Sequence, residues 1–80
     1  MPAVASVDGT TIVLYYNDHP PPHFHARKAE HRAKIAIADQ AVIAGSLPPS
    51  CLRKVVRWAA ANNDLLANYW NASQQGAAIP

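Results

Sequence analysis

Apolar and polar positions alternate through the first half of the chain, which is the two-residue period of β-strands. Asp8-Gly9 separates the first two alternating stretches and is typical of a tight hairpin turn, because both residue types accept positive φ angles. Three prolines at 20–22 then interrupt the pattern, since proline fixes φ and has no backbone donor. We therefore predict a meander of four or five antiparallel strands, built from residues 3–7, 10–16, 23–27, 32–38 and 41–45.

From Ser46 onward the apolar spacing becomes that of helices. The first helix is predicted over about 50–61, beginning at Ser50, with an apolar stripe formed by Leu52, Val55, Val56 and Ala59. A break at 62–64 precedes a second helix, which runs to about residue 75 and ends at Gly76; its apolar residues are Leu65, Leu66, Tyr69 and Trp70. The fold class is α+β, a small antiparallel β-meander followed by two C-terminal α-helices.

The domain organisation follows from these two halves and from the length. Eighty residues make one domain, 1–80, in which 1–45 form the meander, 46–76 the two-helix segment and 77–80 a tail. Half of the residues are apolar, but 16 are alanine, so the core is thin. We expect a protein partner or a second copy of the chain, a homo-oligomer, to help stabilise it.

Composition also excludes several classes of protein. Charged residues are only 15% of the chain and the apolar residues are patterned, which argues against disorder. No apolar run approaches the roughly 18 residues of a membrane-spanning helix, and the N-terminus shows no secretory signal. The single cysteine, Cys51, cannot form an internal disulfide. These features predict a cytoplasmic protein without membrane contact.

The unusual feature is histidine, because all four lie between positions 19 and 31. On a strand, His23 and His25 project from the same face about 6.6–6.8 Å apart at Cα, and Arg27 continues the row. Further cations follow at Lys28, Arg32 and Lys34, whereas Glu30 is the one acid between 19 and 34. The net charge of the whole chain is only +2, so the positive charge is local.

One interpretation of this row is metal-independent RNA cleavage, which needs no cofactor. His23 and His25 would act as general base and general acid, and Arg27 would hold the phosphate. Tyr15 or Tyr16 could join them from an adjacent strand, and we take Tyr16 as the catalytic candidate. Lys28, Arg32 and Lys34 would bind the nucleic acid.

A second interpretation is a site for zinc or another transition metal held by His19, His23 and His25. In an extended polyproline spacer His19 and His23 lie about 12 Å apart at Cα, near the limit for sharing one ion. A third interpretation needs no function, because an exposed strand face carries polar residues in many proteins. The alternation fits all three, although the third leaves the gathering of histidines and prolines unexplained.

The string YYNDHPPPHFHAR, with Tyr15 to His19 and Pro21 to His25, resembles a family of small bacterial proteins known as domain of unknown function 4160. Later matches are Ala33 to Ile37, Gly45, Leu47-Pro48, Trp58-Ala59 and Asn68 to Trp70. Members of that family are often encoded beside a small protein of another type, domain of unknown function 2442. The resemblance implies the toxin-like half of a toxin–antitoxin pair, with that neighbour as partner. It carries over no catalytic residues.

Two classes of function therefore remain open. The chain is either a toxin-like RNA-binding protein or ribonuclease, or a non-enzymatic protein-binding module, with or without a metal held by histidines.

Overall fold

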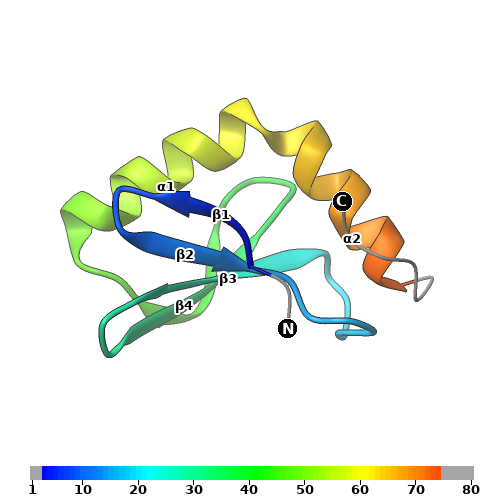
Figure 1. The fold of residues 1–80 in the computed structure, drawn as a ribbon, viewed down its shortest axis with the longest axis horizontal. Helices are drawn as coiled ribbons and strands as arrows, with labels where there is room; N and C mark the ends of the chain where they lie inside the picture. Colours follow the sequence, from blue (N-terminus) through cyan, green and yellow to red (C-terminus); the bar gives the residue numbers. More distant parts are fainter. Residues whose placement is uncertain (1–2, 75–80) are drawn as a thin grey trace.

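The computed structural model describes residues 3–74, in which a five-stranded antiparallel sheet is followed by two helices (Figure 1). The strands are β1 (Ala3–Val7), β2 (Thr10–Val13), β3 (His23–Lys28), β4 (His31–Ala36) and β5 (Val42–Ser46); the helices are α1 (Pro49–Ala61) and α2 (Asn63–Gln74). The strands follow one another across the sheet in the order β1-β2-β3-β4-β5. The predicted α+β class and the predicted meander are confirmed.

The hairpin turns form where the sequence allows positive φ. Asp8 and Gly9, between β1 and β2, have φ angles of 49° and 82°, as expected for this dipeptide. The predicted strand 10–16 ends early, at Val13. Val13 pairs with Ala3 on one side and with His25 on the other, near the start of both partner strands. β3 extends two residues past this pair, to His23, but residues 14–16 do not pair with it and begin the connection to β3.

The core lies between one face of the sheet and the inner side of the helices. The sheet contributes Ile12, Phe24 and Ile35, which have no exposed surface. Helix α1 crosses this face and buries Val55 and Ala59, and α2 buries Leu66 and Trp70 (Figure 1). The predicted apolar stripe of α1 is thus largely buried, since Leu52 and Val56 are also partly covered. Leu65 of α2 points outward and is 39% exposed.

The two helices are nearly continuous. The break predicted at 62–64 is a single residue, Asn62, whose backbone N–H donates to the carbonyl oxygens of Trp58 and Ala59. Asn63 already belongs to α2, and its side chain donates to the carbonyl oxygen of Ile37 at the end of the sheet. Helix α1 begins at Pro49, one residue before the predicted Ser50. The predicted stop at Gly76 and the tail 77–80 lie outside the described residues.

Helix α2 extends beyond the end of the sheet and lies beside the connection between β2 and β3 (Figure 1). The backbone N–H of Asn17 donates to the carbonyl oxygen of Ser73 over 3.2 Å. The side chain of Gln74 donates to the carbonyl oxygen of Asp18 over 2.9 Å. These two bonds attach residues 17 and 18 to α2. Neither α1 nor α2 has the length and apolar character needed to cross a membrane.

Candidate metal centre

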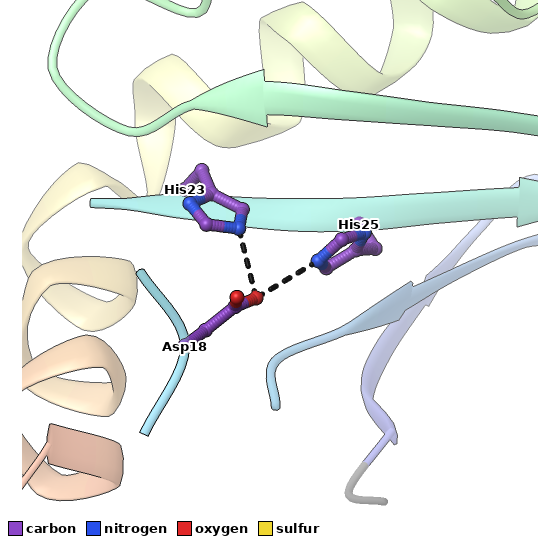
Figure 2. A group of neighbouring side chains, drawn as sticks. All are labelled: Asp18, His23 and His25. Atoms are coloured by element: carbon purple, nitrogen blue, oxygen red, sulfur yellow. Dashed lines mark hydrogen bonds and ion pairs between the residues drawn. The ribbon is translucent and has the colours of Figure 1, made fainter. Parts of the chain in front are cut away.

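Three side chains converge at the start of β3 (Figure 2). His23 and His25 come from the strand itself, and Asp18 comes from the preceding connection. The Nε2 atom of His23 lies 2.9 Å from Asp18 Oδ2, and the Nε2 atom of His25 lies 3.1 Å from the same oxygen. One ligand atom from each residue falls within 4.8 Å of the other two. The cluster therefore presents two imidazole nitrogens and one carboxylate oxygen to a common point.

The local backbone explains why Asp18 reaches the histidines. Asn17 has a φ of 54°, a left-handed conformation that asparagine accepts more readily than most residues, and it reverses the chain direction. The Oδ1 atom of Asp18 accepts the backbone N–H of His19 over 2.9 Å, which orients the carboxylate. The other oxygen, Oδ2, is left facing the two rings.

The hydrogen bonds of His23 define the chemistry of the cluster. Its Nδ1 atom lies 2.7 Å from the carbonyl oxygen of Pro21, and a carbonyl oxygen can only accept, so Nδ1 carries a hydrogen. In a neutral ring the other nitrogen, Nε2, is then an acceptor. That acceptor faces the oxygen of Asp18, which is also an acceptor. A positive charge, either a second proton on the ring or a metal ion, is needed to make this contact favourable.

Aromatic rings surround the two histidines. The His23 side chain has no exposed surface, and its ring centroid lies 5.2 Å from that of Trp70 in α2. The ring of His25 lies edge-on to Tyr15 at 4.6 Å and to His23 at 5.1 Å. His25 is 27% exposed, so the cluster opens to solvent on its side. The packing fixes both rings and leaves one approach.

The charge on Asp18 is stabilised by its neighbours. Partial burial raises the pKa of this carboxyl, but the hydrogen bonds from His25 and from the His19 backbone, together with the charge and hydrogen bond of His23, lower it by more. The net effect is a pKa below the ordinary aspartate value. Asp18 is therefore a carboxylate at neutral pH, the form that binds a cation.

The structure distributes the predicted site residues over three places. His23 and His25 are together, as the strand period predicted. His19 is exposed and contributes its backbone to Asp18, and its side chain is outside the three-residue cluster. Tyr16 is 46% exposed, and it is Tyr15 that contacts His25.

The predicted cations also separate. Arg27, Arg32 and Lys34 share the face of the sheet turned away from the helices, where Lys34 pairs with His25 and Arg32 with Arg27. Lys28 alternates to the opposite side and donates to the carbonyl oxygen of Asp8 in the β1–β2 turn. Lys28 therefore does not join the other three.

Sequence reasoning missed two members of the site. Asp18 is one of two carboxylates close in sequence to the histidines, with Glu30 as the other, and its distance of five and seven residues from His23 and His25 gave no direct indication of contact. Trp70 matches a helical core position, and nothing in its spacing points to His23.

The arrangement suits a divalent transition metal. Two imidazoles and one carboxylate are a common ligand set for zinc and for non-haem iron, and both leave coordination positions open. Ligand atoms each about 2.1 Å from a metal lie about 3.0 Å apart at right angles, as in octahedral coordination, and about 3.4 Å apart in a tetrahedral zinc site. The two separations at Asp18 Oδ2, 2.9 and 3.1 Å, match the right-angle value and are slightly shorter than the tetrahedral one. The bond from His23 Nδ1–H to Pro21 is the outer-shell contact that orients a ligating histidine.

Comparison with known proteins places the chain in a family without assigning it an activity. No curated protein and no solved structure matches it. The family model described as Domain of unknown function (DUF4160) matches residues 9–71, a range that includes the whole cluster and most of both helices. The chain belongs to the DUF4160 family.

Proposed function

We propose that the protein binds one divalent transition metal ion, zinc or iron(II), through Asp18, His23 and His25, with coordination positions left open for a ligand. The observation that carries the proposal is the contact of His23 Nε2 with Asp18 Oδ2 at 2.9 Å, which joins two acceptors whenever the His23 ring is neutral. An ion bound there would act as a Lewis acid on whatever occupies the open positions.

A metal ion satisfies this geometry more completely than protons do. With protons alone, both imidazoles have to donate to one carboxylate oxygen, and His23 has to carry two hydrogens inside the protein. Burying a charged ring costs free energy even when it is paired. One metal ion replaces both contacts, keeps His23 neutral and uses the tautomer that the Pro21 carbonyl imposes.

The geometry gives less support to metal-independent RNA cleavage by the two histidines. A general acid or base has to reach the substrate, and His23 has no exposed surface and uses both ring nitrogens within the protein. Only His25 reaches solvent. A toxin-like role beside a small neighbouring protein, and a cytoplasmic location, stay predictions from the resemblance and from composition.

Metal titration of chelator-treated protein tests the proposal. Cobalt(II) is added as a spectroscopic substitute and zinc is measured by calorimetry, with circular dichroism as the check on folding. We expect one ion per chain, and a loss of affinity greater than about 100-fold in Asp18→Ala and in His25→Ala, since even outer-shell changes cost 10–100-fold.

Two matched variants complete the experiment, because each removes an imidazole outside the cluster. His19→Ala and His31→Ala are both at exposed positions and should bind metal like the wild type. If the folded protein binds no metal, the proposal is wrong. If His19→Ala loses affinity and Asp18→Ala does not, the ligand set is the one predicted from sequence.

A further inference from the structure

A shallow hollow adjoins the cluster on the face of the sheet turned away from the helices. It has a volume of about 250 Å³ and is lined by His25, Arg32, Ala33, Lys34, Ala44 and Gly45. His25 belongs to both the hollow and the candidate metal centre. A molecule in the hollow therefore lies beside the solvent-facing side of the centre.

The strand register brings the cations of this face together. Lys34 is directly opposite His25 across the β3–β4 pair, and Arg32 is directly opposite Arg27. Residues paired in this way lie on the same side of the sheet with Cβ atoms about 4.5–5.5 Å apart, and like charges in such pairs destabilise a sheet. Within residues 3–74, none of the three cations Arg27, Arg32 and Lys34 forms an ion pair with a carboxylate. The face thus keeps a repulsion that a bound anion would relieve.

Small residues of β5 leave the space that an anion needs. Ala44 pairs with Lys34 and Gly45 pairs with Ala33, so the strand next to the cations offers almost no side-chain volume. Gly45 has a φ of +74°, and its Cα approaches the backbone of Arg32 so closely that a Cβ there would overlap the Arg32 carbonyl group. A β-bulge between Lys34 and Ile35 adds to the irregularity at this point. The result is a concave surface with Arg32 and Lys34 at its sides.

We propose that the hollow binds the phosphate group of a phosphate ester and presents it to the metal centre. This assignment rests on the proposed metal site, because it names the substrate class for that site. A metal ion combined with arginine and lysine side chains is a recurrent arrangement for stabilising the charge of phosphoryl groups. The guanidinium group of Arg32 offers the bidentate donors that phosphate oxygens accept. Nucleotides and single-stranded nucleic acid share this chemistry.

Binding of two probes to metal-loaded and to chelator-treated protein tests the proposal. The probes are inorganic phosphate, followed by calorimetry, and a fluorescent oligoribonucleotide of about ten residues, followed by anisotropy over a range of salt concentrations. The variant is Arg32→Ala/Lys34→Ala. Its control is Arg53→Ala/Arg57→Ala, which removes the same charge from exposed positions of α1. Metal content is measured separately on each protein.

We expect the Arg32→Ala/Lys34→Ala variant to bind phosphate at least 10-fold more weakly, with unchanged metal content and an unchanged control. If the natural ligand is a nucleic acid, the oligonucleotide binds more tightly than phosphate, and the variant lowers the salt slope by about 1.4, or 0.7 for each lost contact. If it is a small ester, phosphate binds and the oligonucleotide gains nothing. Equal losses in the variant and the control, or no phosphate binding to either form, would overturn the proposal. Phosphate binding without metal binding would instead reject the metal centre and keep the hollow.

Discussion

The replacement of Gly45 by alanine is a stringent test of how β5 is built. Gly45 lies in the edge strand with a φ of +74°. A Cβ at this position would overlap the carbonyl oxygen of Arg32 and lie 3.1 Å from its carbonyl carbon and 3.2 Å from Ala33 Cα. All three are backbone atoms, so no flexible side chain can move aside.

The expected magnitude has three parts. The left-handed conformation costs an alanine roughly 1–2 kcal/mol. Alanine also reduces the entropy of the unfolded chain, which offsets about 0.4–1 kcal/mol. Relieving the overlap requires a backbone shift, and shifts forced by overpacking cost about 1–3 kcal/mol. Gly9 provides the matched control, since its φ is +82° but a Cβ there would only touch the end of Lys28 at 3.7 Å. Gly9→Ala has the first two parts without the third.

Urea unfolding of the two variants measures the difference directly. Gly45→Ala should be less stable than Gly9→Ala by about 1–3 kcal/mol, the cost of the overlap alone. With a slope near 1 kcal/mol per molar urea for a small domain, the midpoints should differ by about 1 M or more. Equal midpoints would refute the close approach of β5 to β4 at Arg32, and with it the concave shape assigned to the hollow.

Three further predictions concern the metal, the core and pH. Zinc at about 100 times its dissociation constant should raise the free energy of unfolding by about 2.7 kcal/mol, which corresponds to a rise in Tm of more than about 10 °C for a domain of this size. Scanning fluorimetry should show this rise for the wild type and little change for His25→Ala, and an equal rise in both would contradict the ligand assignment. Phe24→Ala should lower the free energy of unfolding by about 3–5 kcal/mol because the ring of Phe24 is fully buried, whereas Val42→Ala at the exposed edge should change it by less than about 0.5 kcal/mol. Similar urea midpoints for the two variants would count against the assigned core. In chelator-treated protein, the lowered pKa of Asp18 contributes stability that is present above the unfolded aspartate value of about 3.9 and is lost as pH falls through the folded value. The difference in free energy of unfolding between the wild type and Asp18→Asn, measured in urea, should therefore be larger at pH 5 than at pH 3, and a difference that grows on acidification would contradict the prediction.

The sheet, and the position of His23 and His25 on the same face of one strand, could be predicted because they depend on the local pattern of residues. A two-residue period puts His23 and His25 on one side of β3 and Phe24 on the other, whatever the rest of the fold does. The turn at Asp8-Gly9 is equally local, since its two residues accept the positive φ angles that the hairpin needs. The fold class followed from the two-residue period of the first half of the chain and the helical spacing of the second half.

The third member of the cluster could not be predicted, because its position depends on long-range contacts. The backbone N–H of Asn17 donates to Ser73, and the side chain of Gln74 donates to the carbonyl oxygen of Asp18. Helix α2, at the other end of the chain, therefore holds Asp18 in place. The burial of His23 has a similar origin. It shares a face with His25, which is 27% exposed, but lies at the start of the strand, where Trp70 of α2 packs against it. Strand period assigns a side to a residue and says nothing about what covers that side.

Which of the two tyrosines contacts His25 could not be predicted for a related reason. Alternation along 10–16 puts Tyr15 on the face of Val13 and Tyr16 on the opposite face. Val13 pairs with His25, a long-range register that the sequence alone does not give. Tyr15 accordingly contacts His25, and Tyr16 faces solvent.

The hydrophobic core fixes the geometry of the proposed site more firmly than the site residues do themselves. A slip of one residue in the β3–β4 register would move either Phe24 of β3 or Ile35 of β4, both fully buried, to the outer face of the sheet. The same slip would take His25 away from Lys34 and Arg27 away from Arg32. His25 is thus held beside Lys34, and Arg27 beside Arg32 against the repulsion of their charges, by the burial of the residues between them. A site assembled in this way keeps its spacing without its ligand, which is the condition for binding metal and phosphate without refolding.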